Sequence, residues 1–170
     1  MIETKRLILR PLSCAQLEKY IKCDNSLEVE LQLNATSRTI SPALKEAFVQ
    51  TILPNVADKS KNYLYSTLWT AISKIDNTMV GDLCIVGEPN ADGEIEIGYG
   101  TYDEFQNKGY MAEAVGGMIE WAKTQPKVKA IIASTDKTNT ASFKVLEKNN
   151  FIKTGETVAL FNWKREIDNR

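Results

Sequence analysis

Histidine is absent from the 170 residues of the chain. Its absence excludes Ser-His-Asp and Cys-His nucleophilic catalysis, because both need an imidazole base. It also argues against a catalytic zinc site, since such sites depend on histidine ligands, so we expect no metal. Any proton transfer must use carboxylates, hydroxyls, tyrosine, lysine, cysteine or water.

Cysteine and long apolar runs are scarce. Cys14, Cys23 and Cys84 are scattered and odd in number, which argues against a disulfide framework and favours a reducing, cytoplasmic location. No apolar run approaches the roughly 20 residues that span a bilayer, and the N-terminus lacks the apolar centre of a signal peptide. We therefore expect no membrane partner.

Neither sign of charge dominates. The chain has 21 Lys and Arg against 22 Asp and Glu, a formal net charge of -1, and no long basic block. Nucleic acid is not an expected partner, because neutralising phosphates supplies most non-specific affinity. The length and a hydrophobic content of 43% predict one domain, residues 1–170, with its own core.

Hydrophobic periodicity predicts alternating strands and helices. Ser13 and Gln16 form a capping box for a first helix, and Ser41-Pro42 begins a second helix, which we expect Pro54 to end. Strands are predicted at 6–11, 68–75, 79–86, 94–101, 128–133, 151–156 and 158–165, with later helices after the loop at 106–109 and at 139–148. The order β-α-α-β-β-β-α-β-α-β-β predicts an α+β fold around a mixed sheet.

The most informative segment is 106–114, Gln-Asn-Lys-Gly-Tyr-Met-Ala-Glu-Ala. It follows the predicted strand 94–101 and begins an amphipathic helix. The first turn of a helix carries four unpaired N–H groups and partial positive charge, so this arrangement suits a pyrophosphate. Many helices begin after a glycine and bind nothing, however, and the chain has neither a P-loop nor a Gly-x-Gly-x-x-Gly motif. This segment alone therefore does not identify a phosphate site, and other parts of the sequence must support that interpretation.

Four segments, in the same order along nearly the whole chain, resemble the GNAT family of N-acetyltransferases. The Gln-x-x-Gly spacing is similar to the acyl-CoA loop of that family, and residues 139–151 resemble its Asn-x-x-Ser-x-x-x-Leu-Glu-Lys-x-Gly-Phe motif. Residues 4–11 and 96–99 resemble the branch of the ribosomal-protein N-terminal acetyltransferases. The resemblance implies the GNAT fold, a central mixed, mostly antiparallel sheet flanked by helices, in which two splayed strands form a slot for acetyl-CoA.

The resemblance also implies which residues bind the cofactor. Backbone N–H groups of the loop would hold the pyrophosphate, and a backbone N–H near Ile97 would polarise the thioester carbonyl. Asn139 would cap its helix, bind the cofactor, or do both. The implied cofactor-binding residues are Ile97, Gln106, Asn107, Lys108, Gly109, Tyr110, Met111, Ala112, Asn139 and Ser142.

Two positions depart from the family pattern. Met111 stands where the loop motif ends in a small residue. A flexible methionine is compatible with the site if its side chain turns into the core, whereas pointing at the phosphates would weaken cofactor binding. Asn150 replaces the glycine before Phe151, and asparagine readily adopts the left-handed conformation that ends helices.

The resemblance suggests catalytic roles for two residues. Ser142 would act near the cofactor sulfur, or else bond back to a helical carbonyl; the tyrosine that many relatives have four positions later is Leu146 here. Glu96 would accept the proton of the amine through water, and Glu94 is the second candidate for this role. Alternatively, Glu96 pairs with a basic side chain. Glu113 is expected to complement the helix dipole.

The leading hypothesis is an acetyl-CoA-dependent N-acetyltransferase. Its acceptor would be a primary amine, either a protein N-terminal α-amine or a small-molecule amine, attacking directly in a ternary complex. The first alternative is a non-catalytic acyl-CoA-binding or sensing module of the same fold. The second is an unrelated α+β interaction protein, which would bind no CoA. The family is compatible with a homodimer.

Overall fold

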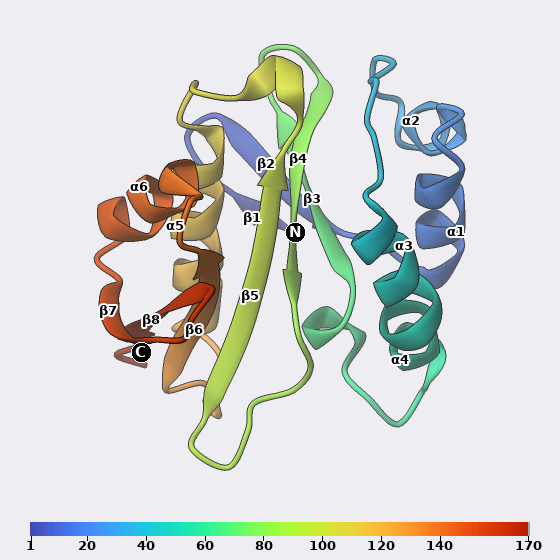
Figure 1. The fold of residues 1–170 in the computed structure, drawn as a ribbon. Coiled ribbons are helices and arrows are strands. Elements are labelled where there is room, and N and C mark those ends of the chain that lie inside the picture. Colours follow the sequence, from blue (N-terminus) through green and yellow to red (C-terminus); the bar gives the residue numbers. More distant parts are fainter. Residues whose placement is uncertain (170) are drawn as a thin grey trace.

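The computed structural model describes residues 1–169, which form an eight-stranded sheet with helices on both faces (Figure 1). The strands are β1 (Ile2–Glu3), β2 (Leu7–Pro11), β3 (Leu68–Ser73), β4 (Thr78–Ile85), β5 (Glu94–Thr101), β6 (Ala130–Asp136), β7 (Ile152–Glu156) and β8 (Leu160–Glu166). Their spatial order is β1-β2-β3-β4-β5-β6-β8-β7. In the described chain β5 and β6 run parallel and the other neighbours antiparallel. The predicted mixed, mostly antiparallel sheet is confirmed.

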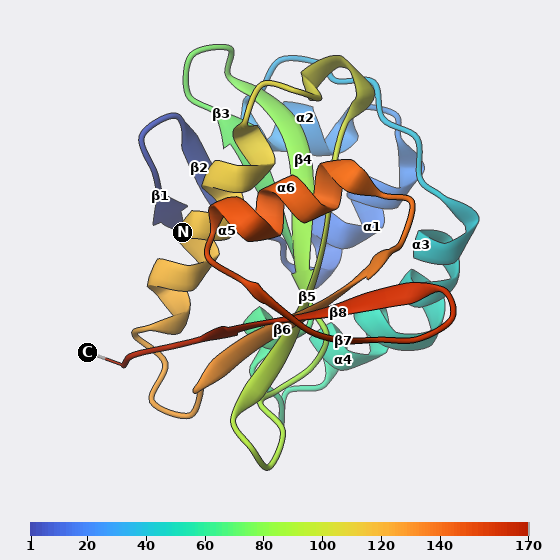
Figure 2. The ribbon, with the colours of Figure 1, turned by 60° about the vertical axis from the view of Figure 1, so that its left-hand side comes forward.

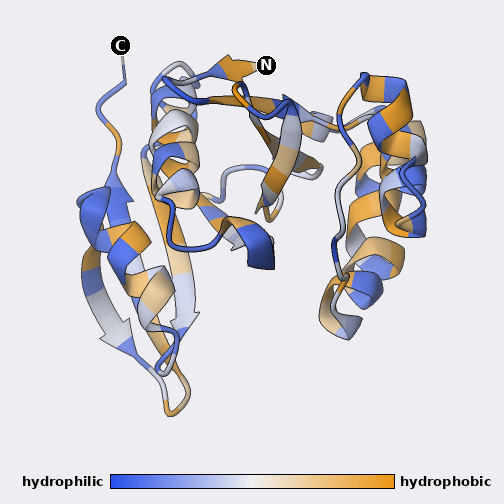
Figure 3. Cartoon of the chain, turned by 90° about the horizontal axis from the view of Figure 1, so that it is seen from above, coloured by the Kyte–Doolittle hydropathy of each residue, from blue (hydrophilic) through white to orange (hydrophobic). Residues whose placement is uncertain are grey.

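The helices divide between the two faces of the sheet, as the views in Figures 1 and 3 show. One face carries α1 (Cys14–Lys22), α2 (Ser26–Leu31), α3 (Pro42–Ala47) and α4 (Leu53–Ala57), and the other carries α5 (Tyr110–Ala122) and α6 (Thr140–Lys148). Short helical turns are η1 (Phe48–Ile52), η2 (Tyr63–Tyr65) and η3 (Asp103–Phe105). Within residues 1–169, none of the helices combines the length and apolarity needed to cross a membrane.

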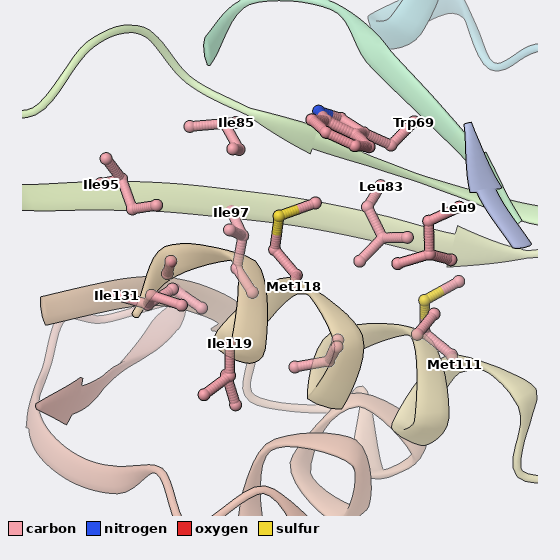
Figure 4. Packing of buried hydrophobic residues seen from close by; sticks show 14 of the residues in the cluster. Leu9, Trp69, Leu83, Ile85, Ile95, Ile97, Met111, Met118, Ile119 and Ile131 are labelled. Atoms are coloured by element: carbon pink, nitrogen blue, oxygen red, sulfur yellow. The ribbon is translucent and has the colours of Figure 1, made fainter. Parts of the chain in front are cut away.

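Each face of the sheet buries its own core. Met118 of α5 packs against sheet residues such as Leu83 and Ile97 (Figure 4). On the opposite face Leu17 and Phe48 lie in a second cluster with residues of β3 and β4. Full burial of one such side chain contributes about 1.5–3 kcal/mol, so the two cores fix the helices on either side of the central strands.

Strands β5 and β6 separate after a short paired stretch. Their register runs from Glu94 opposite Ala130 to Glu96 opposite Ile132, although β5 continues to Thr101. β5 remains paired with β4 up to Thr101, and β6 leaves at an angle together with β8 (Figure 2). One edge of residues 97–101 is therefore free. The splayed strands expected from the family resemblance are confirmed.

The prediction that the second helix ends at Pro54 is wrong. Pro54 does not stop it: α3 continues through the π-helical turn η1 into α4, which ends at Ala57. Pro54 lies in the first turn of α4, where a missing N–H costs least because such donors lack helical partners. The periodicity also missed β1 and α2, which are 2 and 6 residues long, whereas 94–101 and the Ser13 capping box are confirmed.

A buried ion pair fixes the segment 32–41 between α2 and α3. Arg38 pairs with Glu28, and both side chains are only 1% exposed. Arg38 Nη2 also donates to the carbonyl of Tyr20 at 2.8 Å, and its guanidinium lies 4.5 Å from the centre of the Tyr20 ring. A buried charge is tolerated only when it is paired and hydrogen-bonded, so this pair holds segment 32–41 against α1.

Removing Arg38 leaves the Glu28 carboxylate buried without compensation. We predict that Arg38→Ala lowers the free energy of unfolding by about 3–5 kcal/mol, measured by urea denaturation followed by tryptophan fluorescence. Lys19→Ala is the matched control, because it breaks an ion pair with Glu30 that lies at the surface. Equal losses in the two variants would contradict the structural role of the buried pair.

Candidate functional site

Two cavities lie on opposite sides of the free part of β5. The first, which we call the loop cavity, has a volume of about 670 Å³ and lies between the 105–112 segment and α6. The second, the α1 cavity, has a volume of about 480 Å³ and lies under α1 and the segment 37–41. Tyr99, Gly100 and Thr101 line both. The two cavities therefore meet where one edge of β5 has no partner strand.

A row of unpaired backbone donors borders the loop cavity, which residues 107–112 line except for Lys108. Residues 107–112 follow η3 and lead into α5, and none of their six N–H groups donates a hydrogen bond within the described chain. Asn107 and Gly109 adopt left-handed conformations with φ of 61° and 77°, which glycine and asparagine tolerate best. Together with the dipole of the 13-residue helix α5, these donors have the arrangement with which helix N-termini bind anions.

Contacts from the N-terminal segment hold this loop in place. The Glu113 carboxylate accepts hydrogen bonds of 2.6 Å from the Thr4 hydroxyl, the Arg6 backbone N–H and Arg6 Nε. Arg6 Nη1 also donates to the Lys108 carbonyl at 3.0 Å. Partial burial favours the neutral acid, but the bonds from Thr4 and Arg6 prevail and lower the pKa of Glu113. Glu113 thus lies in the first turn of α5, as expected for a dipole contact, and also ties that turn to the N-terminal segment.

Met111 and Asn150, the two departures from the family pattern, fit the structure. The Met111 side chain is 5% exposed and lies in the core beside Leu9 and Leu83 (Figure 4), although Met111 is also among the residues that line the loop cavity. Its backbone remains available to that cavity. Asn150 has φ of 59°, the left-handed conformation expected of the residue it replaces. Neither substitution alters the row of N–H donors.

The start of α6 forms the opposite wall of the loop cavity. The Asn139 side chain accepts from the Ser142 N–H at 3.2 Å, so Asn139 caps the helix as predicted, and both residues line the cavity. The Ser142 hydroxyl has no hydrogen-bond partner among the described residues, while its carbonyl accepts from the Tyr99 hydroxyl at 3.3 Å. Leu146 is fully buried in the core. A hydroxyl at Ser142 is therefore available to a molecule in the cavity.

The carboxylates predicted on β5 lie away from both cavities. Glu94 pairs with Lys164 at 3.0 Å, which is the structural alternative considered for an acid on this strand. Glu96 lines neither cavity and forms no ion pair within the described chain, so its role as a base stays a prediction. Ile97 is the first residue beyond the last paired position of β5 and β6.

A buried acidic group in the α1 cavity was not singled out from the sequence. Asp82 of β4 accepts hydrogen bonds through Oδ2 from the hydroxyls of Tyr20, at 2.6 Å, and Tyr102, at 2.7 Å. Its Oδ1 is buried without a partner in the described chain. Burial raises the pKa of Asp82 to about 6, although the two hydroxyls and Arg38 oppose the shift. Its only sequence signal is a single acid within the otherwise uncharged strand 78–85.

Comparison with known proteins agrees with this geometry. Residues 6–152 match the family described as the acetyltransferase (GNAT) domain. The chain is 28% identical over 166 residues to YjdG of Bacillus subtilis (strain 168), described as an uncharacterized N-acetyltransferase, with 96% of each protein covered. The match therefore spans nearly the full length of both chains.

Solved structures share the fold. A ribosomal-protein alanine acetyltransferase from Vibrio fischeri has a TM-score of 0.70 at 20% identity, covering 98% of this chain and 96% of that one. RimL, described as a ribosomal α-N-protein acetyltransferase in complex with coenzyme A, has a TM-score of 0.67 at 17% identity, covering 98% and 97%. The fold of the predicted branch is thereby confirmed. With its splayed strands, its loop at the start of α5 and a family match across most of its length, the chain belongs to the GNAT acetyltransferases.

Proposed function

We propose that the chain transfers an acetyl group from acetyl-CoA to a primary amine by direct attack in a ternary complex. The observation that carries the proposal is the row of six unpaired N–H groups at 107–112. All of these residues except Lys108 line a cavity that shares its β5 lining with a second cavity. One cavity suits the cofactor and the other the acceptor. A protein N-terminal α-amine is favoured by the ribosomal-protein acetyltransferases that share the fold, and a small-molecule amine is the other acceptor class.

The residues around the loop cavity fit acetyl-CoA. The backbone of residues 107–112 would hold the pyrophosphate, with Gln106 and Lys108 at the edge of the loop. The free edge of β5 from Ile97 onward would pair with the pantetheine amides, because its backbone groups lack a neighbouring strand. Asn139 and Ser142 would contact the cofactor from α6. When bound, the cofactor supplies the activated acetyl group.

Ser142 is the proposed group near the cofactor sulfur. Its hydroxyl has no partner among the described residues and lies on the wall of the loop cavity. It would protonate the departing thiolate and take a proton back from solvent. Glu96 remains the acid that the sequence favours for accepting the proton of the amine through water.

The alternative function is a module that binds acyl-CoA without turnover. The observation that favours it is Leu146, which is fully buried where many relatives have a tyrosine acid. Such a module would bind acetyl-CoA normally and acetylate no amine. Turnover with any amine decides between the two functions.

Filling the anion site should abolish cofactor binding. We predict that the wild-type protein binds acetyl-CoA with micromolar affinity by calorimetry and that Gly109→Trp does not bind, because the indole occupies the space before the N–H groups. Gly87→Trp is the matched control: Gly87 also has a positive φ, of 88°, and nothing lies within 4 Å of a Cβ there. Equal binding by all three proteins would contradict the loop site, and no binding by the wild type would overturn the proposed function.

Removing the Ser142 hydroxyl should slow the reaction without weakening cofactor binding. We predict that Ser142→Ala lowers kcat by about 100-fold, the lower end of the range for a group that assists proton transfer, while the KM for acetyl-CoA stays constant. The measurement is a thiol-release assay with free-N-terminus peptides and polyamines as acceptors. Ser134→Ala, at an exposed serine outside both cavities, should match the wild type. An unchanged kcat in Ser142→Ala would contradict the assignment.

A further inference from the structure

The α1 cavity contains an acidic centre that the proposed reaction has not yet used. We propose that Asp82 receives the ammonium group of the acceptor in this cavity and takes its proton. The proposal rests on the acetyltransferase function above and names the acceptor as a cationic primary amine. In this proposal Asp82, and not Glu96, is the base that accepts the proton of the amine.

The position of Asp82 relative to β5 supports this assignment. Asp82 of β4 lies opposite Gly100 of β5 in the antiparallel register, and Gly100 lines both cavities. A Cβ built at Gly100 would meet no atom within 4 Å, so this position presents open space beside the carboxylate. Gly100 therefore places no side chain between Asp82 and the point where the cavities meet.

The hydrogen bonding of Asp82 leaves one oxygen for a ligand. Oδ2 is occupied by the hydroxyls of Tyr20 and Tyr102, which hold the carboxylate in one orientation. Oδ1 is buried beside the Thr70 hydroxyl of β3, which stabilises the charged carboxylate, and Oδ1 has further acceptor capacity that no described residue fills. An ammonium group donates hydrogen bonds and carries the opposite charge, so it would satisfy Oδ1.

The charges around the α1 cavity favour a cation. Its lining contains three acids, Asp82, Asp103 and Glu104, and one basic residue, Arg38. Arg38 is already paired with the buried Glu28, which offsets its positive charge. The cavity lining therefore carries a net negative charge. Because the site is partly buried, salt screens the attraction between these charges and a bound cation only weakly.

Groups from every neighbouring element determine how Asp82 titrates. Tyr20 of α1, Tyr102 after β5, Arg38 of the segment 32–41 and Thr70 of β3 stabilise its charged form against burial. Burial raises the pKa of both tyrosines, so they stay neutral donors, and burial also raises the pKa of Cys84, which stays a thiol. At neutral pH Asp82 is thus a carboxylate. Its pKa of about 6 is closer to neutral pH than the ordinary pKa of aspartate, which makes it a better base.

The proton balance of the step follows from this geometry. The acceptor ammonium gives one proton to Asp82 Oδ1, and its nitrogen then uses the freed electron pair to form a bond to the acetyl carbonyl carbon. The C–S bond breaks, and its electron pair leaves with the sulfur. The nitrogen loses its second proton to the thiolate through Ser142, and Asp82 releases its proton to solvent. The products are an amide, the CoA thiol and one proton.

Asp82→Asn tests the proposal because it keeps the shape and the acceptor oxygen for the tyrosines. With saturating acetyl-CoA and a panel of a diamine, a polyamine and peptides with N-terminal serine or alanine, we expect kcat/KM to fall by about 100-fold or more. Acetyl-CoA affinity should stay unchanged. Wild-type kcat/KM should fall as the pH drops below about 6, because the carboxylate becomes protonated, and this limb should vanish in Asp82→Asn. Asp92→Asn, in an exposed turn, should match the wild type.

A second variant keeps the test valid if Asp82→Asn does not fold. Gly100→Val places a side chain in the open space beside Asp82 at a position without positive φ, and should raise the acceptor KM at least 10-fold. Because Gly100 also lines the loop cavity, the variant is measured at acetyl-CoA concentrations that saturate it. Wild-type kinetics in Asp82→Asn, or a loss of activity in Glu96→Gln with an unchanged Asp82→Asn, would overturn the proposal. Acetyl-CoA binding without acetylation of any amine in the panel would also overturn it. A wild-type protein that does not bind acetyl-CoA would instead overturn the proposed function.

Discussion

The separation of β5 from β6 after Glu96 is the constraint on which the rest of the structure depends. A sheet normally pairs its backbone groups throughout, and unpaired edges are avoided or covered. Here the pairing stops after 94–96, in the middle of the sheet. The loss leaves a free backbone edge at 97–101 and brings the loop cavity and the α1 cavity together at Tyr99, Gly100 and Thr101. Pairing β5 and β6 along their full length would close the passage between the two cavities.

The elements around this opening are held in place by hydrogen bonds and ion pairs. Glu113 ties the start of α5 to Thr4 and Arg6, and the Arg38–Glu28 pair fixes the segment over the α1 cavity. In contrast, the N–H groups at 107–112 and Asp82 Oδ1 lack partners in the described chain. Glu28 Oε2 and Arg38 Nε also lack partners, but the residues at 107–112, except Lys108, and Asp82 line the two cavities that meet at β5. A ligand in these cavities would complete their hydrogen bonding.

The sequence predicts the elements with long periodic patterns and misses the short or tertiary ones. The strand 94–101 and the helix after the loop are readable because apolar residues recur along them and glycine precedes the helix. β1 and α2 are too short to carry a period, and Pro54 misleads because the π-helical turn before it places proline in a new first turn. The loop residues follow from local backbone chemistry. The Asp82 centre does not, because its partner Tyr20 lies 62 positions away in the chain.

Amide-resolved hydrogen exchange, with and without saturating acetyl-CoA, tests the central claim most directly. We predict that the amides of residues 107–112 exchange fast in the free protein and are protected by acetyl-CoA, together with amides on the free edge of β5. Slow exchange at 107–112 before acetyl-CoA is added, or unchanged exchange there in its presence, would contradict the claim that these N–H groups form the cofactor site.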